Sequence, residues 1–312
     1  MRHRHFQVDG QVQVGPLTLP HPIVAASGTF GYGDEVARLC PPTELGALTV
    51  KSLLPDPWPG NPAPRVAPVT AGMMNAVGLP GPGIAAWIQD DLPVLVASGA
   101  RIIGSIWGRS VTDYETAAKQ IDAVRDSLIA LEVNVSCPNV EARSEIFGHS
   151  CEATAAVVRA VRTATTLPLF VKLSPNVTSI VEIARVALDE GADGLTCVNT
   201  VIGLSIDPET RRPRLGKGGG GLSGPAIKPI AIRAVRDIRD AFPDVPIIGT
   251  GGVATGLDAV EMLLAGANAV GVGTATFQEP RATLRIRNEL YAWCDAHNVV
   301  RVADLTGQME RP

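Results

Sequence analysis

The stretch PIIGTGGVATGLDAVEMLLAGANAVGVGT, residues 246–274, decides the fold. It opens with a short apolar run that ends in two glycines, continues as a helical segment over 255–265 that stops at Gly266, and returns to an apolar run over 269–274. Such an order is typical of parallel sheets, because two parallel neighbours need a crossover connection between them. The stretch therefore predicts a strand, a helix and a second strand.

The same unit recurs along the whole chain. Apolar runs without strict alternation, as expected of strands that are buried on both faces, lie at 23–28, 47–52, 101–106, 131–136, 169–174, 194–199, 246–252 and 269–274. These eight runs match the number of strands that closes a (β/α)8 TIM barrel. We therefore predict an α/β fold, with one barrel domain spanning residues 1–312.

Three segments depart from this regular unit. Alternating apolar residues around Gly15 and Pro16 predict an N-terminal β-hairpin. The βα loops at 53–83 and 200–225 are long, as lids and binding loops often are. The GKGGGG run at 216–221 lacks the phosphate-binding P-loop pattern, so we expect a flexible loop there. A helix follows over 226–242, with a predicted apolar stripe through Ile227, Ile230, Ala234, Val235, Ile238 and Phe242.

The composition excludes several classes of protein. A net charge of −4 and only 4% aromatic residues give no reason to expect nucleic acid or an anionic membrane as a partner. The cysteines are few and scattered, without a CxxC pair or metal-ligand spacing, which favours reduced thiols in a cytoplasm. The N-terminal residues lack the apolar segment of a secretory signal peptide, and no run approaches the roughly 20 apolar residues of a membrane-spanning helix.

The ends of the predicted strands hold the polar residues. In a TIM barrel these ends meet at one face, where the active site lies. The residues predicted to lie there are Ser27, Gly28, Lys51, Ser52, Ser105, Asn134, Cys137, Lys172, Asn199, Thr200, Gly251, Gly252, Gly273 and Thr274. Two lysines, two asparagines and a cysteine on one face are hard to explain as packing, because buried polar groups need partners.

The glycines and lysines each allow two interpretations. Glycines after the last two strands let backbone N–H groups approach a phosphate, although glycines also serve tight turns. Lys51 and Lys172 are suited to anchoring a phosphate, forming a Schiff base or stabilising a negative charge; alternatively, each extends to solvent at the barrel rim. Their shared position favours a phosphate-bearing ligand.

Cys137 is the most specific candidate for catalysis. It follows a strand end and lies between Asn134 and Asn139, next to Pro138. Most cytosolic cysteines are inert and buried, but a thiol pKa near about 8.5 suits a general base. The nearest histidine in sequence is His149, so proton abstraction fits better than a Cys–His nucleophile. Cys151 is a second, weaker candidate: it opens a predicted helix, whose dipole would lower the pKa of the thiol.

Ten motifs in order resemble the class 1 dihydroorotate dehydrogenases, flavoproteins of pyrimidine (UMP) biosynthesis. They are ASGTFG (26–31), KS (51–52), GNPAPR (60–65), NAVGL (75–79), NVSCPN (134–139), KLSPNV (172–177), ADGLTCVNT (192–200), GGLSGPAIKP (220–229), IIGTGGV (247–253) and VGVGT (270–274). The KLSPNV motif and the Phe-Gly pair at 147–148 resemble those of the B subtype, in which such a chain is the FMN-binding catalytic subunit.

The resemblance implies a role for each matching position. The cofactor FMN would be bound by Ser27, Lys51, Ser52, Ser105, Asn134, Lys172, Val198, Gly224, Gly251, Gly252, Gly273 and Thr274. The substrate dihydroorotate would be held by Lys51, Asn75, Ala76, Val77, Gly78, Leu79, Asn134, Asn139, Asn199 and Thr200. Cys137 would take the C5 proton while the hydride leaves C6 for flavin N5. The resemblance implies no metal at this site.

The B subtype usually works with a partner subunit that carries FAD and an iron–sulfur cluster and passes electrons to NAD. The chain itself has neither a four-cysteine cluster pattern nor a dinucleotide fingerprint, so NAD chemistry would require that second chain. Fumarate is an alternative acceptor, and a homodimeric core is expected. The chain departs from the family pattern at Ser105, where an asparagine is common, and at Pro80–Gly81.

Three rival functions remain open. A related flavin enzyme that reduces uracil-type pyrimidines shares the asparagine–cysteine loop. A phosphate-binding barrel lyase would use Lys172 as a Schiff base. A non-catalytic scaffold would bind no cofactor.

Overall fold

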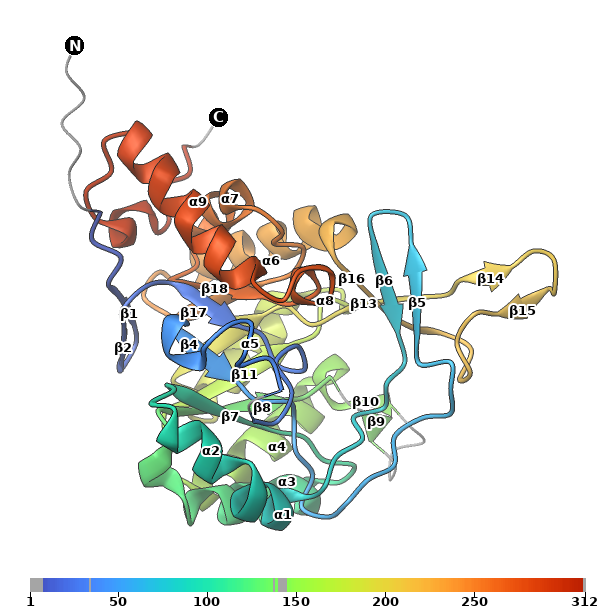
Figure 1. The fold of residues 1–312 in the computed structure, drawn as a ribbon. Coiled ribbons are helices and arrows are strands. Elements are labelled where there is room, and N and C mark those ends of the chain that lie inside the picture. Colours follow the sequence, from blue (N-terminus) through green and yellow to red (C-terminus); the bar gives the residue numbers. More distant parts are fainter. Residues whose placement is uncertain (1–7, 34, 137, 140–144, 311–312) are drawn as a thin grey trace.

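The computed structural model describes residues 8–33, 35–136, 138–139 and 145–310, and it contains a closed barrel of parallel strands (Figure 1). The strands follow one another around the barrel in chain order. They are β3 (Ile23–Ala25), β4 (Ala47–Thr49), β7 (Ile102–Ile106), β8 (Ala130–Asn134), β11 (Leu169–Leu173), β12 (Gly194–Cys197), β17 (Ile247–Thr250) and β18 (Ala269–Val272), which pairs with β3. The predicted (β/α)8 fold is therefore confirmed.

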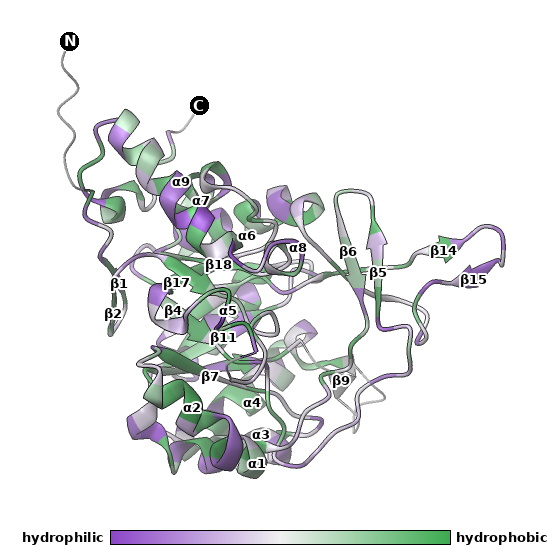
Figure 2. Cartoon of the chain, viewed as in Figure 1, coloured by the Kyte–Doolittle hydropathy of each residue, from purple (hydrophilic) through white to green (hydrophobic). Residues whose placement is uncertain are grey.

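The barrel strands are mostly apolar because both of their faces are covered. Every residue of β7, β8 and β11 is buried, and Figure 2 shows β7, β17 and β18 in the colours of hydrophobic residues. Most strands end one to three residues before the apolar runs do; β8, for example, stops at Asn134. The residues beyond each strand have left the hydrogen-bonded ladder, so they form the rim on which the site is built.

Helices surround the barrel (Figure 1). They are α1 (Ile84–Asp90), α2 (Leu92–Ala97), α3 (Val111–Asp122), α4 (Cys151–Ala164), α5 (Ile180–Asp189), α6 (Lys228–Ala241), α7 (Gly256–Ala265), α8 (Ala275–Gln278) and α9 (Ala282–Ala296), with short 3-10 turns at Pro42–Glu44, Arg125–Ser127, Phe147–His149, Pro225–Ile227 and Val302–Leu305. Local residues set their ends: Ser179 caps α5, and Thr255 and Asp258 form a capping box on α7.

The predicted apolar stripe of the helix at 226–242 was wrong at one position. Ile230 is 44% exposed, whereas Ala231 is buried. The regular helix begins only at Lys228, after a 3-10 turn over Pro225–Ile227. The tighter turn changes the angular position of the residues that follow, so the buried face of α6 runs through Ala231, Ala234, Val235 and Ile238.

The N-terminal hairpin lies at the end of the barrel opposite the strand tips. Strands β1 (Val12–Val14) and β2 (Leu17–Leu19) pair as predicted around Gly15. A Cβ added at Gly15 would lie 2.7 Å from Pro246, the residue that precedes β17. The hairpin thus covers the amino end of the barrel with four buried apolar side chains, Val12, Val14, Leu17 and Leu19.

The two long βα loops combine into an antiparallel sheet that stands beside the barrel (Figure 1). Its strands are β13 (Val201–Gly203), β16 (Gly220–Ser223), β6 (Gly72–Asn75) and β5 (Val66–Val69), in that order. A hairpin of β14 (Ile206–Asp207) and β15 (Arg212–Pro213) projects from it, and β9 (Pro138–Asn139) pairs with β10 (Glu145–Ile146) elsewhere.

The expectation of a flexible glycine loop at 216–221 was wrong at its end, because Gly220 and Gly221 belong to β16. Both positions require glycine, because neighbouring segments of the chain lie too close to leave room for a side chain. An added Cβ would lie 2.3 Å from the Asn75 carbonyl oxygen at Gly220, and 2.0 Å from Thr200 Oγ1 at Gly221. Within the described residues, no helix is long and apolar enough to span a membrane.

Candidate active site

A cavity of about 610 Å³ lies between the carboxyl ends of the barrel strands and the β13–β16–β6–β5 sheet. This volume is within the range of small-molecule and cofactor sites. Strand tips and the loops after them supply Ser27, Gly28, Thr29, Lys51, Ser52, Asn134, Lys172, Val198, Asn199, Thr200, Thr250, Gly251, Gly252, Gly273 and Thr274. The long loops supply Val66, Ala67, Pro68, Ala71, Gly72, Met73, Asn75, Val77, Leu79, Ser223 and Gly224.

The cavity is positively charged. Lys51 and Lys172 line it, whereas no aspartate or glutamate is among the described residues that do so. Two ammonium groups in a concave, largely apolar site attract anions more strongly than they would on an open surface. The site therefore suits a ligand that carries negative charge.

Lys51 lies just past β4 and is held against an aromatic ring. Its Nζ is 5.0 Å from the centre of the Tyr32 ring, and the Tyr32 hydroxyl donates to the carbonyl oxygen of Pro80. Burial lowers the pKa of Lys51, repulsion from Arg65 lowers it further, and attraction to Glu35 opposes both. Tyr32 was missed from the sequence, because nothing in the chain order indicates that it lies beside Lys51.

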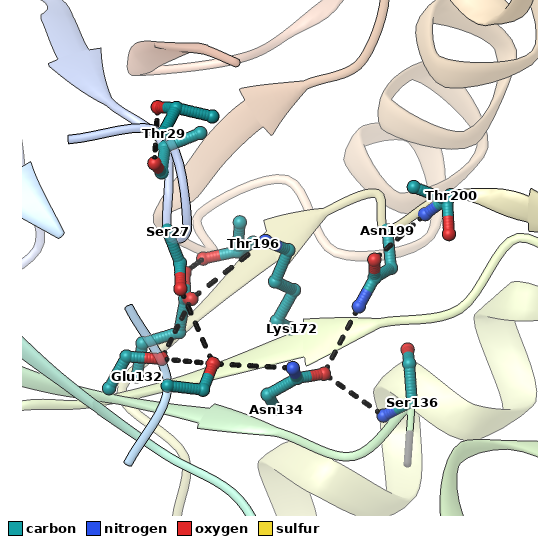
Figure 3. Close-up of polar contacts among 12 residues, drawn as sticks. Ser27, Thr29, Glu132, Asn134, Ser136, Lys172, Thr196, Asn199 and Thr200 are labelled. Atoms are coloured by element: carbon teal, nitrogen blue, oxygen red, sulfur yellow. Dashed lines mark hydrogen bonds and ion pairs between the residues drawn. The ribbon is translucent and has the colours of Figure 1, made fainter. Parts of the chain in front are cut away.

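The two asparagines form one hydrogen-bonded unit (Figure 3). Asn134 Oδ1 accepts from Asn199 Nδ2 at 3.1 Å and from the Ser136 backbone at 3.2 Å. Asn199 Oδ1 accepts from the Thr200 backbone at 2.8 Å. Both side-chain oxygens are thus engaged within the protein, so the amides present their remaining N–H groups to a ligand.

Hydroxyl groups connect the cavity to the barrel interior. Ser52 Oγ lies 3.3 Å from Ser27 Oγ and 2.9 Å from Ser105 Oγ, and it accepts from Asn134 Nδ2 at 3.3 Å. Ser105 is fully buried and does not line the cavity, so it contacts the cavity indirectly, through its neighbour Ser52. Beyond Ser105 lies Glu132, a buried carboxylate that sequence reasoning missed. Its signal was the two-residue spacing from Asn134, which places both side chains inside the barrel.

The glycine-rich end of the cavity contains unsatisfied hydrogen-bonding capacity. Thr250 Oγ1 is buried and has no hydrogen-bond partner within the described part of the chain. A Cβ added at Gly273 would meet only Ala26 and Thr29, at 3.7 and 3.8 Å. Thr274 Oγ1 donates to Ser223 Oγ at 2.8 Å, joining the barrel to the neighbouring sheet. This end therefore has space and one unpaired hydroxyl, that of Thr250, for a polar ligand group.

Some predicted site residues lie elsewhere. Ala76 and Gly78 belong to the loop that contributes Asn75, Val77 and Leu79, but they do not line the cavity. Cys151 opens α4 and lines a separate groove. Only the backbone of Asn139 is described, as part of β9. Cys137 lies outside the described residues.

Comparison with known proteins agrees with this geometry. The family model of dihydroorotate dehydrogenase matches residues 10–293. The chain belongs to the dihydroorotate dehydrogenase family. Its flavin-dependent members oxidise dihydroorotate in pyrimidine biosynthesis, so the resemblance found in the ten sequence motifs is confirmed.

Relatives of this dihydroorotate dehydrogenase family member match over nearly their full length. The "Dihydroorotate dehydrogenase B (NAD(+)), catalytic subunit" of Alkaliphilus oremlandii is 43% identical over 96% of this chain and 98% of its own. The "Putative dihydroorotate dehydrogenase A (fumarate)" of Solibacter usitatus is 46% identical over 94% and 96%, respectively. A crystal structure of the Eimeria tenella enzyme with ferulenol superposes with a TM-score of 0.81 at 25% identity, covering 97% of this chain and 89% of that one.

Proposed function

We propose that this chain is the FMN-binding catalytic subunit of a dihydroorotate dehydrogenase and that it oxidises dihydroorotate to orotate. The observation that supports this most strongly is the cavity: two lysines and two donor-presenting asparagines surround it, at strand tips of a chain from this family. The entire chain, residues 1–312, would then form one FMN-binding domain.

The residues present fit FMN. The phosphate would be bound at the end formed by Gly251, Gly252, Gly273, Thr274 and Gly224, where Thr250 Oγ1 is unpaired. Ser27, Ser52, Asn134, Lys172 and Val198 would hold the ring system, with Lys51 shared between cofactor and substrate. Ser105 would support the ring indirectly, by fixing the position of the Ser52 hydroxyl.

The substrate would be held on the side of the cavity formed by the long loops. Asn75, Val77, Leu79, Asn199 and Thr200 line that side, and Ala76 and Gly78 complete the backbone of its loop. The N–H groups of Asn134 and Asn199 suit the carbonyl and carboxylate oxygens of a dihydropyrimidine, and Asn139 would add a further amide. The Lys51 ammonium would compensate the negative charge of the substrate carboxylate.

The chemistry divides between two adjacent carbons of the substrate. Bound FMN supplies the acceptor for the hydride that leaves C6. Cys137 would act as general base and take the proton from C5. Lys51 and Lys172 are the groups of this chain that would favour negative charge in the cavity. Lys51 lies against the Tyr32 ring and Lys172 beside the Glu132 carboxylate, so both charges would be in place before reaction.

The physiological acceptor and the assembly follow from the subtype. We favour the B type, in which a second subunit with FAD and an iron–sulfur cluster links the reaction to NAD, around a homodimeric catalytic core. Relatives named for NAD and for fumarate both match this chain closely, so fumarate is the alternative acceptor. The described cysteines Cys40, Cys151, Cys197 and Cys294 are free thiols, which suits a cytoplasmic enzyme.

The visible spectrum of the purified protein tests the proposal. Flavin absorbance, with FMN released on denaturation, supports it; a colourless protein that traps a carbonyl substrate on Lys172 with borohydride would favour the lyase instead. Uracil-type substrates are the second flavin-dependent candidate. They lack the carboxylate that Lys51 would bind, so dihydroorotate should reduce the flavin faster than dihydrouracil.

A further inference from the structure

Two opposite charges are buried together inside the barrel. Glu132 and Lys172 are 3% and 7% exposed, and among the described residues they are the only buried side chains of Asp, Glu, Lys or Arg. Glu132 lies on β8 and Lys172 on the adjacent strand β11, with Oε1 and Nζ 4.0 Å apart. Burying either charge alone costs free energy, and apolar side chains of similar size would fill the space at least as well, so packing does not account for the pair.

Glu132 is held in place from two further sides (Figure 3). Its Oε1 accepts from Ser105 Oγ at 3.4 Å, and its Oε2 accepts from Thr196 Oγ1 at 3.0 Å. The carboxylate does not line the cavity. It is therefore a fixed negative charge behind the cavity wall, and its position is set by strands β7 and β12.

Lys172 differs from Glu132, because its ammonium reaches the cavity. It lines the cavity, and within the described residues its only polar partner is the Glu132 carboxylate. An ammonium has three donors, so most of its hydrogen-bonding capacity is available to a ligand. The buried Glu132 carboxylate thus lies beside an ammonium group that faces the cavity.

We propose that Glu132 is a positioning residue: it anchors the Lys172 ammonium at the cavity wall, and the pair acts as one unit that sets the reduction potential of the bound flavin. This inference rests on the proposed flavin site. A fixed positive charge favours the reduced, more negative flavin, and the carboxylate behind it limits that effect. Lys172 without Glu132, or Glu132 without Lys172, would leave an uncompensated buried charge.

A double-mutant cycle of Glu132→Gln, Lys172→Met and the double variant tests the unit. Urea unfolding and the midpoint potential of the bound flavin are measured for each protein. Lys172→Met should shift the potential negative, because the carboxylate is left uncompensated beside the cavity. Adding Glu132→Gln should return the midpoint potential toward the wild-type value by at least about 30 mV. For two electrons, this shift is a tenfold change in the ratio of affinities for reduced and oxidised flavin. The double variant should also lose less unfolding free energy than the sum of the single variants.

Thr196→Val is the matched control, because it removes a hydrogen bond to Glu132 but no charge. Added to Lys172→Met, it should not restore the potential. Additive losses of unfolding free energy in the cycle, or coupling in unfolding without any recovery of the potential, would overturn the proposal. If Lys172→Met releases the flavin, recovered flavin binding in the double variant replaces the potential, and failure to recover it counts against the unit.

The outcome is separable from that of the proposed function. Neither measurement uses dihydroorotate, so a protein that binds flavin but oxidises another substrate would still show the coupling. A protein without any flavin would refute the proposed function, and the proposed role of the pair with it, whatever the unfolding data show.

Discussion

Asn199 Nδ2 donates a hydrogen bond to Asn134 Oδ1 at 3.1 Å, which joins the tip of β12 to the tip of β8. The bond uses the oxygen of Asn134 and leaves N–H groups of both amides for the cavity. Two residues that are 65 positions apart in the chain thus leave one kind of group, the hydrogen-bond donor, at one cavity. This arrangement fits the acceptor oxygens of orotate.

Replacement of Asn199 by aspartate tests this donor arrangement. Asn199→Asp places a carboxylate oxygen against Asn134 Oδ1 and near an anionic ligand, so orotate should bind at least about tenfold more weakly, the usual loss for a hydrogen bond to a charged group. Asn199→Ala, the matched control, should lose less because it adds no repulsion. Titration of orotate by flavin absorbance gives the dissociation constants. Equal losses in the two variants would contradict the arrangement.

The affinity for orotate should depend on pH through Lys51. Burial lowers its pKa from 10.5, so the ammonium loses its proton at a lower pH than an ordinary lysine does. The dissociation constant should therefore rise as the pH increases, and the rise should begin at a lower pH than for a lysine with the ordinary pKa of 10.5. Lys51→Met should bind orotate weakly at every pH and lack this rise. A rise of the same size in Lys51→Met would assign the effect to another group.

A methyl group at position 273 should disturb ligand binding but not folding. The added Cβ would be at ordinary contact distance from Ala26 and Thr29, at 3.7 and 3.8 Å, so the free energy of unfolding without flavin should stay within about 1 kcal/mol of wild type. If the FMN phosphate is bound there, Gly273→Ala should weaken FMN binding by at least about tenfold. Fluorescence titration of the flavin-free protein measures this. Unchanged FMN affinity would show that the phosphate binds in another part of the cavity.

His21 should make the fold sensitive to acid. Burial lowers its pKa from 6.5 to about 4, and its neutral ring accepts from the Ile23 backbone and contacts the Glu44 carbonyl oxygen. The unfolded chain binds the proton more tightly, so the free energy of unfolding should fall by up to about 3 kcal/mol as the pH drops from about 6.5 to about 4. His21→Gln removes this titration, and urea unfolding across that range should show a shallower fall. An identical slope in both proteins would exclude His21 as the cause.

The sequence predicted the architecture well because strand–helix alternation is a local pattern. The barrel and the N-terminal hairpin both depend on residues close together in the chain. The β13–β16–β6–β5 sheet was not predicted, because it joins two loops about 150 positions apart. The residue at which α6 begins depends on a 3-10 turn, which the spacing of apolar residues does not reveal.

The candidate site divides in the same way. Residues at strand tips, such as Lys172 and Asn199, could be predicted because a barrel gathers its carboxyl ends at one face. Tyr32 could not, because its importance comes from Lys51, which lies beside it in space. The spacing of Glu132 from Asn134 indicated that it points into the barrel, but not that it lies beside Lys172. The sequence motifs predicted that Ser105 contacts the cofactor directly. In the structure Ser105 does not line the cavity, and Ser52 lies between the two.

Anaerobic mixing of the purified, flavin-loaded protein with dihydroorotate, followed by flavin absorbance, tests the central claim most directly. The account predicts rapid bleaching of the flavin and formation of orotate, with bleaching slowed by at least about a hundredfold in Cys137→Ser, which should retain its FMN. A flavin that stays oxidised in the wild-type protein would contradict the assigned reaction, and equal rates in the two proteins would remove Cys137 from it.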